Sequence, residues 1–230
     1  MRTIFTCIFG GVDELKEPFV VNQHWKYVCY TDQDFESNAW EIRKVPVMAC
    51  GPTKTARWYK INFHEHIETD ESLYIDGTFF VNTNLDRWFR KFTPPMTVIN
   101  HPFDKCIYTD VQSCIKGGKG NFFDLVRQAN DYKTEGLPVN NGLISSGILM
   151  RRKTKEVIKL CREWWEQVEK YSERDQIAFG YAAWKNRGIF NTIDWDYTKR
   201  TEFIHCPHLT KPWRDARHRQ IMDTYGTKGT

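Results

Sequence analysis

The sequence predicts an α/β fold with a mostly parallel central sheet flanked by helices. Short runs rich in β-branched and aromatic residues alternate along the chain with segments of helical periodicity. Of the 230 residues, 40% are hydrophobic and 27% are charged, a composition that can supply a substantial core. No internal repeat or low-complexity linker interrupts the chain, so we expect one domain over residues 1–230.

Four strands and two helices are expected in the first hundred residues. The strands are predicted at residues 3–9, 26–30, 73–81 and 97–100, and the helices at 56–67 and 85–92. The third strand is interrupted by Asp76-Gly77, which places an acidic residue where a buried strand emerges. In such sheets, ligands bind at the carboxyl ends of the strands, so residues directly after strands are the first candidates for a site.

The second half of the chain continues the alternation. A helix is predicted over residues 122–132 and a strand over 143–150. The clearest helix follows, with apolar residues at intervals of four and three: Val157, Cys161, Trp164, Val168 and Tyr171. Ser172 is the expected N-cap of a last helix that extends to about residue 184, and Ser172 with Asp175 resembles a capping box.

The charge and hydropathy of the chain argue against a nucleic-acid-binding, membrane-spanning or secreted protein. The net charge is +4, too weak by itself to indicate a nucleic-acid partner. Basic residues do cluster at 151–155 and 211–219, which we interpret as solvated helix ends and a surface tail. No apolar run approaches the roughly 20 residues of a membrane helix, and the first residues do not resemble a secretory signal, so we expect a cytoplasmic protein.

The seven cysteines do not form a CxxC pair. Cys7, Cys29 and Cys161 lie in apolar segments and are expected in the core, which favours a reducing compartment over a disulfide framework. Cys206 and His208 do not predict a zinc site, because no second ligand pair has the usual spacing.

Two residues could hold a divalent ion. Asp76 is either a ligand for a hard metal that binds a diphosphate or the first residue of an Asp-Gly turn. His205 is either a further ligand for an ion such as Mn²⁺ or a structural histidine, and Lys211 could supply positive charge to a phosphate. Gly10-Gly11-Val12-Asp13 could cradle a nucleotide but lacks the GxGxxG pattern, and the chain has no GxSxG, P-loop or HExxH motif.

Taken in order, short fragments of the chain resemble one family of enzymes. The chain is similar to retaining GT-A glycosyltransferases of the glycogenin and lipopolysaccharide-galactosyltransferase group, and nearer still to a group that includes plant mucilage-related glycosyltransferases. The fragments are Phe9–Asp13, Val28–Asp32, Arg57–Ile61, Tyr74–Gly77, His101-Pro102, Gly142-Leu143, Ser146-Gly147 and Arg174–Gln176. At the end of the chain, His205 is followed six residues later by Lys211-Pro212-Trp213, as in the glycogenin-type enzymes. The resemblance implies a GT-A fold with a Rossmann-like domain.

The resemblance also implies a set of site residues. Asp76, Thr78 and His205 would hold Mn²⁺ or Mg²⁺; Thr78 stands where the family has the second acid of an Asp-x-Asp motif, which weakens the expected metal affinity. Asp175 and Gln176 would lie near the reacting carbon of the sugar. The residues expected to bind the nucleotide sugar are Phe9, Gly10, Gly11, Asp13, Asp32, Arg57, Lys60, Ile75, Asp76, Gly77, Ser146, Gly147 and Lys211.

The function implied is transfer of a hexose or related sugar from a UDP-sugar to a glycan, protein or nucleic-acid acceptor. Retention by front-face attack is expected, with the leaving phosphate helping to take the acceptor's proton. Residues 1–100 would form the nucleotide-binding half, and 101–230 the acceptor half with the C-terminal metal and phosphate segment. Two alternatives remain open at this point: a metal-dependent phosphohydrolase acting on a diphosphate ester, and an inactive GT-A scaffold that serves as a binding module.

Overall fold

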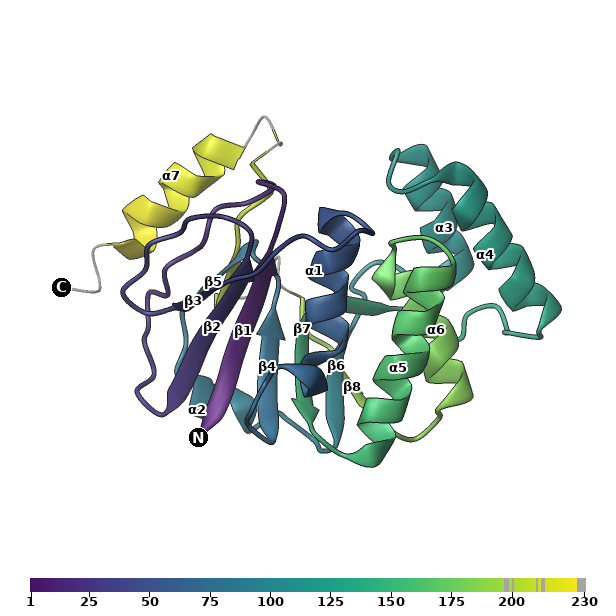
Figure 1. Cartoon of the computed structure of the whole chain (residues 1–230), viewed down its shortest axis with the longest axis horizontal. Helices are drawn as coiled ribbons and strands as arrows, with labels where there is room; N and C mark the ends of the chain where they lie inside the picture. Colours follow the sequence, from purple (N-terminus) through teal and green to yellow (C-terminus); the bar gives the residue numbers. More distant parts are fainter. Residues whose placement is uncertain (197–198, 200, 210, 212–213, 227–230) are drawn as a thin grey trace.

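A seven-stranded sheet forms the centre of the computed structural model (Figure 1). The structure describes residues 1–196, 199, 201–209, 211 and 214–226. The strands of the sheet, in spatial order, are β3 (Glu41–Lys44), β2 (Trp25–Thr31), β1 (Arg2–Ile8), β4 (Glu71–Ile75), β7 (Ile144–Arg152), β6 (Met96–Asn100) and β8 (Asn191–Ile193). Only β7 runs antiparallel to its neighbours β4 and β6. The predicted mostly parallel α/β sheet is therefore confirmed.

Helices cover both faces of this sheet. On one face, α1 (Pro52–Ile61), α5 (Lys155–Lys170) and α6 (Asp175–Lys185) pack on a cluster that includes Trp164 and Phe179. On the other face, α2 (Leu85–Phe89) buries Trp88 among strand residues. The pair α3 (Ile107–Lys116) and α4 (Phe122–Thr134) lies beyond α6 at the side of the molecule, as Figure 1 shows. The fully buried side chain of Trp164 confirms the apolar stripe predicted for α5.

A separate two-stranded ribbon joins distant parts of the chain. β5 (Phe79–Val81) pairs antiparallel with β9 (Phe203–His205), so that Phe79 lies opposite His205. The helix α7 (Arg214–Tyr225) packs against the ribbon, with Ile221 in a small cluster with Phe80 and Ile204. The ribbon brings the residues directly after β4 next to the last part of the chain.

Several predicted element boundaries were wrong. The helix expected from residue 56 begins at Pro52 and ends at Ile61, followed by a 3-10 turn over Phe63–Glu65. Ser172 does not cap α6: its hydroxyl donates to Oε1 of Gln128 at 2.5 Å, and Arg174 occupies the N-cap position without a side-chain capping bond. No sequence pattern predicted β3, α3, β8, β9 or α7.

The basic cluster at residues 151–155 is not a continuous surface patch. Arg151 is fully buried, with its guanidinium 4.1 Å from the ring centre of Phe63 and Nη1 donating to the Ile61 carbonyl at 3.3 Å. Aromatic faces attract a cation and replace part of the solvation that burial removes. The prediction of a solvated cluster failed for Arg151 because β7 turns this side chain into the core.

The cysteines follow the prediction. Cys7, Cys29 and Cys161 are buried in the core, and all seven cysteines are free thiols. Burial raises the pKa of the Cys29 thiol to about 12. Among the described residues, no helix is long and apolar enough to cross a membrane.

The substitution Gly180→Ala should destabilise the protein, although alanine is worth about 1 kcal/mol more than glycine inside an ordinary helix. A Cβ at position 180 would lie 2.4 Å from Cγ2 of Ile107, and overpacking of this kind costs about 1–3 kcal/mol. Urea unfolding of the single variant should therefore show a net loss of stability. In an Ile107→Ala background, Gly180→Ala should become neutral or stabilising. A stabilising effect in the wild-type background would show that α3 and α6 are not in tight contact.

Candidate functional site

Three cavities adjoin one another at the edge of the sheet where most strands end. The first, of 270 Å³, lies at the end of β1, the second, of 280 Å³, at the end of β4, and the third, of 910 Å³, at the ends of β6 and β8. Arg57, Asp76 and His208 line both the first and the second cavity, and His101 lines both the second and the third. The cavities therefore form a row that follows the order of the strands.

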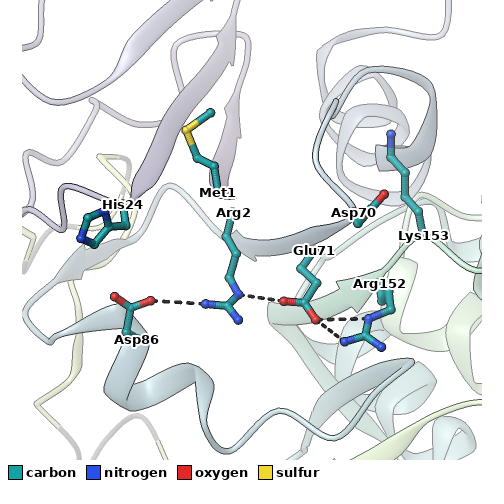
Figure 2. Close-up of a pocket in the computed structure, with 8 residues that line it drawn as sticks. All are labelled: Met1, Arg2, His24, Asp70, Glu71, Asp86, Arg152 and Lys153. Carbon is teal, nitrogen blue, oxygen red and sulfur yellow. Dashed lines mark hydrogen bonds and ion pairs between the residues drawn. The ribbon is translucent and has the colours of Figure 1, made fainter.

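A further cavity, of 690 Å³, lies at the opposite end of the strands (Figure 2). Four of its charged side chains are paired with one another: Glu71 binds both Arg2 and Arg152, at 2.8 and 2.5 Å, and Arg2 also contacts Asp86. Because these four side chains already bind one another and the cavity is away from the carboxyl ends of the strands, we do not assign it to the functional site.

The three predicted metal ligands line the second cavity together. Asp76 and Thr78 follow β4, and His205 ends β9, so the β5–β9 ribbon holds them side by side. Burial lowers the pKa of His205, which leaves its imidazole in the neutral form that binds metals. The part of the chain that the structure describes contains no group of three or more His, Cys, Asp or Glu side chains with metal-site geometry. The protein thus offers a small set of ligands rather than a complete metal cage.

A buried lysine joins two of the three acids of this cavity, Asp76 and Asp175. Nζ of Lys60 lies 2.6 Å from Oδ2 of Asp175, 3.0 Å from Oγ of Ser146 and 3.4 Å from Oδ1 of Asp76. The same oxygen of Asp76 accepts a hydrogen bond of 2.7 Å from the Tyr74 hydroxyl. These contacts tie α1, β4, β7 and α6 together at one point.

Asp175 is held as an anion by its surroundings. Burial alone would raise its pKa, but the charges of Arg57 and Lys60 lower it well below the usual range. Arg57 Nε lies 3.4 Å from Oδ1 of Asp175, and the Ser146 hydroxyl donates to Oδ2 at 2.9 Å. The neighbouring Gln176 lines the same cavity and donates through Nε2 to the Ile144 carbonyl at 2.7 Å.

Lys60 was expected to face the nucleotide sugar, and the structure places it differently. Its side chain is fully buried and lines none of the three cavities, so its contacts are with the protein's own carboxylates. Ile75 is likewise buried in the sheet core rather than at a cavity wall. Arg57, one turn before Lys60 on α1, does line the first two cavities. The two cations lie on the same side of α1 and both contact Asp175, but only Arg57 reaches the cavities.

The loop after β1 forms a wall of the first cavity. Phe9 and Asp13 line it, and Gly77 does so from the neighbouring strand end. Gly10 and Gly11 have φ values of 69° and 66°, which favour glycine, and the Gly10 N–H donates to Asp32 at 3.1 Å. Asp32 therefore holds the loop in place rather than lining the cavity.

Small residues also shape the wall between the first two cavities. A Cβ on Gly77 would lie 2.8 Å from Ile8, and one on Gly147 would lie 3.1 Å from Oδ2 of Asp76. Ser146 and Gly147, which the resemblance implies as nucleotide-sugar ligands, line the second cavity. Glycine at 147 keeps the Asp76 carboxylate in its place beside β7.

Lys211 lies outside the three cavities in the described part of the chain, with its N–H donating to the His208 carbonyl at 3.0 Å. Pro212 and Trp213, which complete the expected motif, fall outside the described residues.

Five titratable residues of the second cavity were not assigned from the sequence: His101, Asp110, Lys119, Arg174 and His208. His208 Nδ1 lies 2.7 Å from Oδ2 of Asp13, and this hydrogen bond raises the pKa of His208 despite its partial burial. His101 and Arg174 stood in the fragments that carried the resemblance, whereas Asp110 lies on α3, a helix that the sequence analysis did not predict.

The chain matches one known protein family over more than half of its length. The sequence model of the TOD1/MUCI70 glycosyltransferase-like domain matches residues 66–205, a span that begins before Asp76 and ends at His205. The chain belongs to this family. Membership confirms the expected relationship to the mucilage-related group and makes glycosyl transfer the class of reaction. A search of curated proteins found none that matches the chain.

Solved structures of glycosyltransferases are similar to this chain at low sequence identity. Mouse xyloside xylosyltransferase 1 in its apo form is 10% identical, with a TM-score of 0.49, over 98% of this chain and 93% of that one. The glycosyltransferase GlyE of Streptococcus pneumoniae TIGR4 is 13% identical, with a TM-score of 0.45, over 84% of this chain and 45% of that one.

Lys60→Met should destabilise this TOD1/MUCI70 family member by about 3–5 kcal/mol, because it leaves two buried or half-buried carboxylates without their shared cation. Chemical denaturation measures the loss. Adding Asp175→Asn should recover much of it, since the uncompensated charge is then removed. Lys54→Met, on the same helix but bonded to main-chain carbonyls, is the control and should cost far less. Equal losses in the two single variants would contradict the role given to Lys60.

The bond between His208 and Asp13 should make stability depend on pH. Because the folded-state pKa of His208 is raised, its contribution is fully present below the ordinary histidine pKa of about 6.5 and is lost as the pH rises through the folded value. The difference in unfolding free energy between the wild type and His208→Gln should therefore shrink on going from about pH 5.5 to pH 8.5. His24→Gln, at an exposed position, is the control. A difference that stays constant with pH would contradict this linkage.

Proposed function

We propose that this family member is a metal-dependent glycosyltransferase that moves a hexose or related sugar from a UDP-sugar to an acceptor, with retention of configuration. The observation that carries the proposal is the meeting of Asp76, His205 and Asp175 in one cavity, although they come from separate parts of the sequence. Gln176 and Ser146-Gly147 line the same cavity. These are the positions at which the family resemblance expects the diphosphate and the sugar.

The residues fit a divalent ion whose coordination shell is completed by phosphates of the substrate. Mg²⁺ and similar ions are commonly held by one or two protein ligands together with phosphates and water. Asp76 and His205, with Thr78 beside them, would supply the protein ligands for Mn²⁺ or Mg²⁺. When bound, such an ion neutralises charge that develops on a leaving diphosphate. We therefore expect metal affinity to depend on the nucleotide.

The first cavity suits the nucleotide part of the donor. Oδ1 of Asp13 is buried and has no hydrogen-bond partner among the described residues, so it can accept from a base or ribose group. Arg57 lies between the first and second cavities, where its fixed positive charge would face a phosphate. Burying an unpaired carboxylate oxygen is costly, and a bound nucleotide would offset that cost.

Asp175 and Gln176 would border the sugar at the far side of the second cavity. The lowered pKa of Asp175 keeps it ionised, so it can stabilise positive charge that develops at the reacting carbon. The acceptor is a glycan, a protein or a nucleic acid, and a cytoplasmic location remains part of the proposal.

Asp76→Ala and His205→Ala should each abolish binding of UDP that requires Mn²⁺. Thermal shift with Mn²⁺ alone, UDP alone and both together measures this, because stabilisation grows with ligand concentration relative to Kd. The wild type should be stabilised mainly by the combination. His24→Ala, far from the site, is the control. Wild-type affinity in either site variant would contradict the assignment, and release of inorganic phosphate instead of UDP from UDP-glucose would favour a phosphohydrolase.

A further inference from the structure

One carboxylate of the second cavity has no part in the proposed donor site. Asp110 lies in the first half of α3, and only 8% of its surface is exposed. Oδ2 of Asp110 is buried with no hydrogen-bond partner among the described residues, and Oδ1 has only a thiol contact, from Cys114 at 3.9 Å. An unpaired buried carboxylate is costly, so its presence beside a reaction cavity calls for a functional reason.

The three acids of the cavity differ in the ion pairs and hydrogen bonds that their carboxylates already form. Asp175 contacts Lys60, Arg57 and Ser146, and Asp76 contacts Lys60 and Tyr74. Asp175 is stabilised as an anion and is a poor proton acceptor for that reason, whereas Asp76 is already engaged through one oxygen by Lys60 and Tyr74. Asp110 forms no ion pair in the described part of the chain, and burial raises its pKa against the lowering effect of Arg174 and His101. It is the acid of the three best suited to take up a proton.

Asp110 lies in the second cavity close to His101, which separates it from the third cavity. His101 lines both the second and the third cavity and interacts electrostatically with Asp110. Nδ1 of His101 accepts a hydrogen bond of 3.0 Å from the Asp104 N–H, and burial lowers the pKa of the ring. The neutral ring therefore carries its proton on Nε2 and is a donor there, not a base.

The third cavity is large enough for an acceptor and is lined by groups that bind hydroxyls. Asn100, Asn140 and Asp194 line it, and Asn100 donates to Asp194 at 2.7 Å. At 910 Å³ it is larger than the two cavities given to the donor, and it opens on the side of the second cavity away from the first.

We propose that Asp110 is the base that deprotonates the acceptor hydroxyl, which reaches it from the third cavity past His101. This assignment rests on the proposed function. In the step, the acceptor oxygen forms a bond to the anomeric carbon while the bond from that carbon to the UDP oxygen breaks. The electron pair of the broken bond leaves with UDP, and the hydroxyl proton passes to the Asp110 carboxylate rather than to the leaving phosphate. Asp110 later returns the proton to solvent.

Asp110→Asn tests this role, because it keeps the shape of the side chain and removes its basicity. The measurements are UDP release from the UDP-sugar that best stabilises the wild type with Mn²⁺, with water as acceptor, and the calorimetric Kd for UDP with Mn²⁺. A general base contributes about 10²–10⁴-fold to the rate, so kcat should fall at least a hundredfold with the Kd unchanged. Asp124→Asn is the matched control: this residue is an aspartate in the first turn of α4, paired with Arg127 on the surface.

The outcomes separate the two proposals. A fall in kcat of less than tenfold, or a loss of UDP affinity as large as the loss of rate, would overturn the assignment of Asp110 and leave the proposed function standing. If the wild type binds UDP with Mn²⁺ but turns over no UDP-sugar, that result would contradict the proposed function. It would then also contradict the assignment of Asp110 as the base.

Discussion

The fully buried ammonium group of Lys60 is the contact on which the site depends. It lies between Asp175, Ser146 and Asp76, and so joins one helix, two strands and the start of a second helix. Withdrawing a lysine from water costs several kcal/mol, which close carboxylates must offset. That requirement fixes the distance between Asp76 and Asp175, and with it the width of the cavity between them. Lys60 therefore positions the carboxylates of the cavity without lining the cavity itself.

A second constraint comes from the β5–β9 ribbon. It is separate from the main sheet, yet it sets His205 opposite Phe79, three residues after Asp76. This pairing holds the last part of the chain at the end of β4. The hydrogen bond between His208 and Asp13 extends the same contact to the loop after β1. Two short connections therefore bring the C-terminal part of the chain to the first two cavities.

The acids of the second cavity show how one fold gives similar groups different chemistry. Asp175 is surrounded by cations and hydroxyl donors, Asp76 has a tyrosine hydroxyl and a lysine on one oxygen, and Asp110 is buried without an ion pair in the described residues. Environments that push pKa values apart separate roles among like side chains. In the proposed scheme these roles are charge stabilisation, ion binding and proton uptake.

The sequence by itself determined the inner strands of the sheet (β1, β2, β4, β6 and β7), the long α5 stripe, the core cysteines and the acidic residue after β4, because each depends on periodicity or on order along the chain. It also located His205, Ser146 and Asp175 through a family pattern, and these do meet in one cavity. Only the tertiary structure decided that Lys60 and Arg151 are buried, that Ser172 does not cap α6, and that Asp110 and His208 line the site. The reason is physical: whether a charged side chain is solvated, paired or left without a partner depends on neighbours that are distant in sequence and invisible to local pattern.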